Sequence, residues 1–244
     1  MPVPMPSFHD PIATARQEAV PRLERGLAVH PTLIAFEGEE PTLYLRGRPP
    51  TCVEDDEVIA ELLLLPDLLD LTRLLVVSEV RLGVPEPFDV DPEPVGTHSR
   101  AVRPDLDSVE AALAGRAITV DRVERDALGA ISRDGLLLEF HLDDQGGLRF
   151  EPPEPLPQGG PWAEILATRM SRRQPPDADD DFSPPGAVYA LSRFGVVVAV
   201  APGWGARYGF DRPVDPAMVR PEDRRRAQTR LRHRAALTTP EPGR

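Results

Sequence analysis

The chain contains no lysine and no asparagine in 244 residues, so all 28 of its basic Lys+Arg positions are arginine. Both missing amino acids are encoded by A-rich codons, and their joint absence indicates a GC-rich genome, as in a high-GC bacterium. Arginine is therefore partly the default cation of this chain. An arginine-rich segment carries less functional weight here than it would in a protein that also uses lysine.

Cysteine and long apolar runs are equally scarce. The single cysteine, Cys52, excludes an internal disulfide and fits a reducing compartment. The longest apolar runs, such as 196–201, fall far short of the roughly 20 residues that span a bilayer. The N-terminal segment 1–20 lacks the positive region and apolar run of a signal peptide. These absences predict a soluble, cytoplasmic protein.

The net charge of −12 is unevenly distributed. Segment 220–244 contains eight arginines against three acidic side chains, which leaves it at +5 and segment 1–219 at −17. An acidic body disfavours binding to nucleic acid or to an anionic membrane. Only the C-terminal tail remains a candidate for nucleic acid, and no membrane contact is expected.

Hydrophobic residues make up 41% of the chain, enough for a sizeable core, and 30 prolines mark several loops and linkers. The pattern predicts an α+β fold, a mostly antiparallel sheet with three or four helices and an Arg-rich C-terminal helix. We expect, in order, a disordered N-terminal segment (1–20), an α+β domain (21–150), linkers around one helix (151–186), a β-hairpin with an aromatic loop packing on the main domain (187–212), and a basic helical tail (213–244).

Local signals place the first elements. Apolar runs on either side of a Gly-Pro turn predict a hairpin over 32–46. Thr51 and Glu54 have capping-box spacing ahead of a helix that Pro66 should limit. The β-branched, apolar residues 74–80 predict a buried strand.

The middle of the chain predicts a meander after a short helix over 106–114. Asp134-Gly135 is a strong hairpin signal, because both central residues of the type I′ turn that commonly joins two strands need positive φ. The expected strands are 117–124, 128–132, 136–142 and 148–150, with a further turn at 143–147, and the Asp- and Pro-rich residues 85–94 are expected to form a surface loop before the meander.

The C-terminal third combines linkers with three elements. Pro161 begins a helix over 161–171 that has one apolar face. A second Pro- and Asp-rich linker, 174–186, precedes a predicted hairpin of 188–191 and 196–200.

The arginine-rich segment is the sharpest candidate site. Pro221, Glu222 and Asp223 form a good helix start. The arginines that follow surround a helical wheel with few apolar contacts, and three of them repel one another at i,i+4 spacing. They are Arg224, Arg225, Arg226, Arg230, Arg232 and Arg234.

Four explanations remain open for these arginines. Phosphates of nucleic acid or an acidic protein surface would relieve the repulsion. Alternatively, the segment is a solvated tail, or it docks on the acidic body of its own chain. In the loop 203–210, Trp204, Arg207 and Tyr208 suit a protein partner, whereas the alternative is that Trp204, Tyr208 and Phe210 cover the sheet edge.

Other polar groups suggest catalysis or metal binding more weakly. Glu139, His141 and Asp143 alternate on one face of a strand, but their spacing is too long for one ion, so a solvated face is favoured. The acidic residues 177–181 lack the glycine and glutamate of a calcium loop. Cys52 has no assignable partner, and the glycines of 203–209 do not fit a dinucleotide fingerprint. We assign no catalytic residue, metal or cofactor.

Three functional hypotheses follow. The first is a non-catalytic protein that acts through a protein interface in its C-terminal region. The second is a nucleic-acid-associated regulator that binds through the tail. The third is an enzyme of unknown class, which requires Cys52, or Glu139 with His141, to line a concave pocket.

Overall fold

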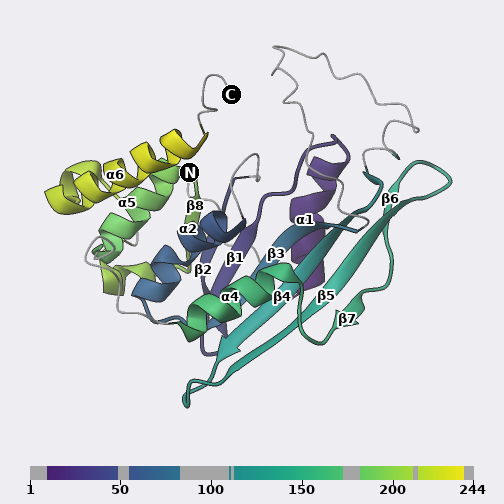
Figure 1. Ribbon diagram of the computed structural model, residues 1–244, viewed down its shortest axis with the longest axis horizontal. Helices are drawn as coiled ribbons and strands as arrows, with labels where there is room; N and C mark the ends of the chain where they lie inside the picture. The colour runs from purple at the N-terminus through teal and green to yellow at the C-terminus, as the bar shows by residue number, and fades with distance from the viewer. Residues whose placement is uncertain are drawn as a thin grey trace, which may run out of the picture.

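The computed structural model describes residues 10–48, 55–82, 110, 113–172, 182–210 and 214–238, with only the backbone for 55–56 and 233–238. Within them, an antiparallel sheet of eight strands is covered by helices on both faces (Figure 1). The α+β prediction is confirmed. The strands are β1 (Thr32–Glu37), β2 (Glu40–Arg46), β3 (Arg73–Arg81), β4 (Arg116–Arg125), β5 (Ile131–Leu142), β6 (Leu148–Phe150), β7 (Glu154–Leu156) and β8 (Val197–Val200).

The strand order is β6-β5-β4-β3-β1-β2-β8, and β7 also pairs with β5. Strand β8 comes from the C-terminal part of the chain, yet it pairs with β2 from the N-terminal part, with Val200 opposite Leu43. One sheet therefore unites segments that are distant in the sequence, and β8 forms one of its edges.

The helices are α1 (Pro11–Leu23), α2 (Asp55–Leu68), α4 (Pro161–Ser171), α5 (Pro184–Phe194) and α6 (Pro221–Thr238), with short 3₁₀ turns η2 (Gly205–Tyr208) and η3 (Pro216–Met218). Helices α2, α4 and α5 pack on one face of the sheet, and α6 lies against α5 (Figure 1). Helix α1 covers part of the other face.

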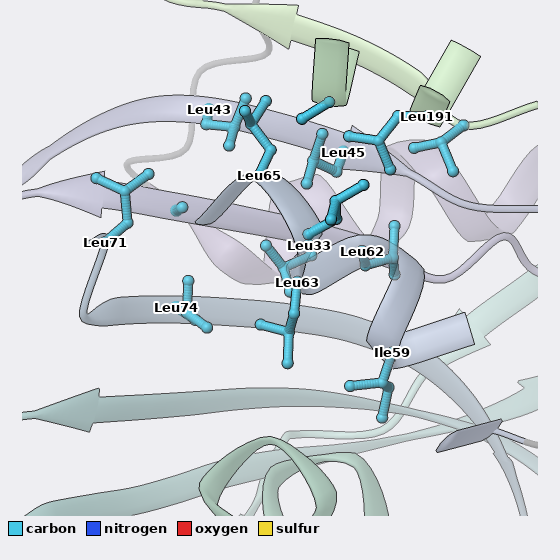
Figure 2. Packing of buried hydrophobic residues seen from close by; sticks show 14 of the residues in the cluster. Leu33, Leu43, Leu45, Ile59, Leu62, Leu63, Leu65, Leu71, Leu74 and Leu191 are labelled. Atoms are coloured by element: carbon cyan, nitrogen blue, oxygen red, sulfur yellow. The ribbon is translucent and has the colours of Figure 1, made fainter. Parts of the chain in front are cut away.

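Alternating side chains of the strands supply both cores. Leu33 and Ala35 face α2, whereas Ile34 between them faces α1. Figure 2 shows leucines of α2 packed against Leu33 and Leu43 of the sheet, with Leu191 of α5 beside Leu45, and Leu62 and Leu65 are completely buried. Burial of each such leucine stabilises the fold by about 1.5–3 kcal/mol.

The N-terminal helix corrects one prediction. Residues 11–20, assigned to a disordered segment, belong to α1. Asp10 caps this helix by accepting hydrogen bonds from the backbone N–H groups of residues 12 and 13, and Pro11 occupies the first helical position. Ala15, Ala19 and Leu23 are fully buried against the sheet. The prolines of this segment favoured the prediction of disorder, although Asp10 and Pro11 form an ordinary helix start.

The Asp134-Gly135 turn is also wrong, because both residues lie within the continuous strand β5. The chain reverses instead at residues 126–130, where the Asp126 side chain accepts hydrogen bonds from two backbone N–H groups. Gly135 pairs with Asp121 of β4, beside the beginning of α4. A side chain at position 135 would collide with Asp121 and with Gly159 before α4. Glycine is therefore required by this close packing and not by a turn.

The predicted hairpin of 188–191 and 196–200 is half wrong. Residues 184–194 form helix α5, and only the second predicted strand exists, as β8. Ser183 caps α5, and Gly195 ends it with φ of 81°. Val188 to Leu191 resembled a strand because the apolar run was short.

Two smaller predictions need adjustment. Pro66 lies inside the last turn of α2 and does not end it, and the linker 151–160 contains strand β7. The hairpin over 32–46, the strand over 74–80 and the helix over 161–171 are confirmed. Several predictions lie outside the described residues: the capping box at Thr51, Cys52, the surface loop 85–94, most of the helix over 106–114 and the acidic residues 177–181.

Candidate functional site

Asp223 lies at the centre of the junction between α5 and α6. Its side chain is completely buried, and it accepts a hydrogen bond of 2.6 Å from the Ser183 hydroxyl. Arg220 donates two hydrogen bonds to the same carboxylate, each of 2.9 Å. Ser183 also accepts from the Gly186 N–H, as the cap of α5. The carboxylate thus joins the beginnings of both helices.

The electrostatics of Asp223 follow from these contacts. Burial by itself would raise the pKa of the Asp223 carboxyl. Hydrogen bonds from Arg220 and Ser183, together with the charge of Arg220, outweigh burial and hold the pKa below its usual range. Asp223 is therefore a charged group in the folded protein at neutral pH.

The rest of the inner face of α6 follows at helical spacing. Ala227 is 1% exposed and belongs to the core, and Leu231 packs against that core. Arg226 lies 3.7 Å from the Asp223 carboxylate, and the Arg230 guanidinium lies 5.6 Å from the centre of the Phe182 ring. The repulsion expected between Arg226 and Arg230 is thus relieved within the chain.

The outer face of α6 carries the remaining described arginines. Arg224, Arg225 and Arg232 are exposed, with Gln228 between them. Arg225 makes one ion pair, of 3.7 Å, with Glu222, and both side chains are more than half exposed. The expectation that α6 has almost no face to bury is wrong. Arg226 and Arg230 turn inward, and the side chain of Arg234 lies outside the described residues.

The aromatic loop faces the interior. Trp204 is 6% exposed, and its indole N–H donates a 3.0 Å hydrogen bond to Glu37 at the end of β1. Arg207 donates to the same carboxylate at 2.6 Å and lies over the rings of Trp204 and Tyr208. The Arg207 hydrogen bond is the main cause that lowers the pKa of Glu37.

This geometry decides between the two interpretations of the loop. Trp204 and Phe210 belong to the core, and Tyr208 stacks beside them. The loop therefore covers the end of the sheet, and Trp204 is withdrawn as a contact residue for a partner. Arg207 remains partly exposed but is already paired.

Glu139 and His141 do line a cleft, of about 540 Å³, at the end of β5. The His141 Nε2 lies 3.8 Å from Glu139 Oε2, and both side chains are about half exposed. Asp143 also lines the cleft, and its carboxylate accepts hydrogen bonds from the backbone N–H groups of Gln145 and Gly147. These bonds hold the pKa of Asp143 below its ordinary value. All three predicted residues therefore line the cleft, but the carboxylate of Asp143 is hydrogen-bonded within its own turn.

The described part of the chain contains no group of three or more His, Cys, Asp and Glu side chains that could hold a metal ion. Glu139 and His141 have the residue types of an acid–base pair, but at 3.8 Å they do not hydrogen-bond, and the described residues that line the cleft include no serine, threonine, cysteine or lysine. Among the described helices, none combines the length and the apolar character needed to cross a bilayer.

Asp121 is a buried acid that sequence reasoning missed. It lies on β4 and accepts a 2.5 Å hydrogen bond from the Gly160 N–H at the start of α4. Its Oδ2 has no hydrogen-bond partner among the described residues, and burial raises the pKa of the carboxyl. Asp121 therefore anchors α4 to the sheet from a fully buried position, with backbone and side chains of β5 and α4 packed closely around it.

No protein-family model matches the chain, and no curated protein and no solved structure is significantly similar to it.

Proposed function

We propose that this chain is a non-catalytic protein that works by binding a partner protein, and that the outer face of α6 contacts an acidic surface of that partner. The contact residues are Arg224, Arg225 and Arg232. The observation that carries the proposal is the division of α6 into two faces. Its inner arginines have partners within the chain, whereas its outer arginines project from a helix that is fixed in place.

Fixation of the helix matters for binding. A flexible basic tail loses conformational entropy when it binds, but a docked helix has already lost it in folding. Asp223, Ala227 and Leu231 hold α6 against the body, so its outer arginines occupy set positions. Arginine forms bidentate hydrogen bonds with carboxylates, which suits recognition of Asp and Glu on a partner.

A protein partner is favoured over nucleic acid by the charge of the body. Segment 1–219 carries −17, and a polyanion that approached α6 would also meet this field. An acidic patch on a folded protein is smaller than a nucleic-acid chain. Such a patch could contact α6 without also approaching the acidic body of the chain. Enzymatic activity is the remaining alternative, since Glu139 and His141 line the cleft of β5.

Reversal of the three outer charges tests the proposal. The variant Arg224→Glu, Arg225→Glu, Arg232→Glu should lose its partner, with a roughly 10- to 100-fold weaker affinity, because attraction becomes repulsion at each position. Full-length protein would capture partners from nuclease-treated lysate, and quantitative mass spectrometry would compare recovery. The fold should persist, since these side chains are exposed.

A matched control reverses three exposed arginines elsewhere, Arg25, Arg81 and Arg122, and changes the net charge by the same amount. Equal loss of the partner in both triple variants would indicate a nonspecific effect of net charge and would contradict the proposal. Capture that occurs only from a parallel lysate without nuclease treatment, with a steep dependence on salt, would identify nucleic acid instead.

A further inference from the structure

The outer edge of β8 is the most unusual surface of the described sheet. The Ala201 N–H donates to the Thr42 carbonyl of β2, so the backbone groups of Ala199 and Val197 also point toward β2 in the alternation of an antiparallel pair. The N–H and C=O groups of Val198 and Val200 consequently point away from the sheet. Within the described residues, these outward groups have no hydrogen-bond partner.

Comparison with the opposite edge makes this exposure significant. That edge is formed by β6 and β7, which have three residues each and carry Arg149, Glu154 and Pro155. Charges and proline are usual means of preventing an edge from pairing with another chain, and β8, with four residues, differs from β6 and β7 in these features more than in length. Residues 196–201 contain neither a charge nor a proline. The β8 edge is therefore suited to pairing and the other edge is protected.

The two ends of β8 also differ in charge. Arg193 is exposed near its N-terminal end, where the Arg48 guanidinium packs against Gly195. At its C-terminal end, the neighbouring strand β2 begins with the exposed Glu40. A second β8 placed antiparallel would bring the basic end of each copy toward the acidic end of the other.

We infer that β8 pairs antiparallel with β8 of a second copy of this chain, about a twofold axis at Ala199. Val198 and Val200 of each copy then exchange four backbone hydrogen bonds with Val200 and Val198 of the other. The Ala199 residues of the two copies face each other as a non-hydrogen-bonded pair, where side chains approach closely and a small residue fits. The two sheets become continuous, and the interface is isologous. This inference is independent of the arginine face of α6.

The mass of the full-length protein in solution tests the inference. Light scattering after size exclusion at micromolar concentration should give about twice the 26.8 kDa of one chain. The variant Val198→Pro should be monomeric, because proline removes an outward N–H while leaving the pairs with β2 intact. Unchanged circular dichroism and melting would show that this variant folds.

A cysteine at the twofold axis provides a second test that does not depend on proline. In a Cys52→Ser background, Ala199→Cys should form a disulfide-linked dimer on mild oxidation, because facing residues of such a pair have Cβ atoms about 4.5–5.5 Å apart. Val198→Cys is the matched control, since it faces Val200 of the second copy and should crosslink much less.

Each outcome decides the inference. A doubled mass, loss of the dimer in Val198→Pro and selective crosslinking of Ala199→Cys support it. A monomer at all concentrations would overturn it and leave the edge to another occupant, an extended segment of another protein or residues 1–9. A dimer that survives Val198→Pro without crosslinking through position 199 would also overturn it, because the interface would lie elsewhere.

Discussion

Substitution of Asp223 by alanine is expected to lower the free energy of unfolding by about 3 kcal/mol and to loosen α6 from α5. The carboxylate is fully buried and accepts hydrogen bonds from Ser183 and Arg220. Its removal leaves the half-buried hydroxyl of Ser183 and the guanidinium of Arg220 without their acceptor. Urea unfolding measures the loss of stability, and hydrogen exchange of residues 221–232 reports the loosening of α6.

Glu222→Ala is the matched control, because Glu222 is the exposed acid next to Asp223, and its substitution should change the free energy of unfolding by less than about 0.5 kcal/mol.

The variant Asp223→Asn tests how the stabilisation by Asp223 depends on pH. Since the pKa of Asp223 is lowered in the folded protein, its stabilising contribution is present above the unfolded pKa of about 3.9 and is lost as the pH falls through the lower folded value. The stability difference between wild type and Asp223→Asn should therefore shrink toward pH 3. Equal effects of the substitutions at 222 and 223 would refute the assigned role of Asp223.

The second large effect is expected from Gly135→Ala, which should destabilise the protein by about 2–3 kcal/mol. A Cβ at this position would lie 2.5 Å from Asp121 Oδ1 and 3.1 Å from the Cα of Gly159. Neither neighbour can move easily, because Asp121 is fully buried and Gly159 belongs to the backbone at the start of α4. Thermal and urea unfolding would measure the effect.

Gly129→Ala provides the comparison, since Gly129 has φ of 88° but no atom within 4 Å of its hypothetical Cβ. That substitution should cost about 1 kcal/mol, from backbone strain alone. A smaller effect at 135 than at 129 would mean that α4 does not pack closely on β5.

Features encoded by neighbouring residues were predictable from the sequence. The hairpin of β1 and β2 needs only two apolar runs and a turn, and α4 needs only Pro161 and one apolar face. Helix α5 was missed although its signals were present in Ser183 and Gly195, because a four-residue apolar run fits a strand or a helix equally well. Gly135 could not be interpreted locally, since its role depends on the start of α4 across the sheet.

The same distinction applies to the candidate site. Sequence reasoning identified the helical tail and its arginines, but it could not divide them between two faces. That division depends on Ser183, which lies 40 residues before Asp223 and forms the junction that fixes α6. The sequence identified the aromatic loop but not the direction of its side chains. Trp204 and Arg207 both donate hydrogen bonds to Glu37 at the end of β1, which lies far away in the sequence.

The most direct test of the proposed function is photocrosslinking in cells from position 228 of the full-length chain. Gln228 is exposed and lies between Arg225 and Arg232, so a benzoylphenylalanine there samples the outer face of α6 without removing an arginine. The account predicts a crosslink to a defined protein with an acidic surface, lost on triple charge reversal of α6 and absent from a probe at the exposed Arg25. Crosslinks only to nucleic acid, or none above those from position 25, would contradict it.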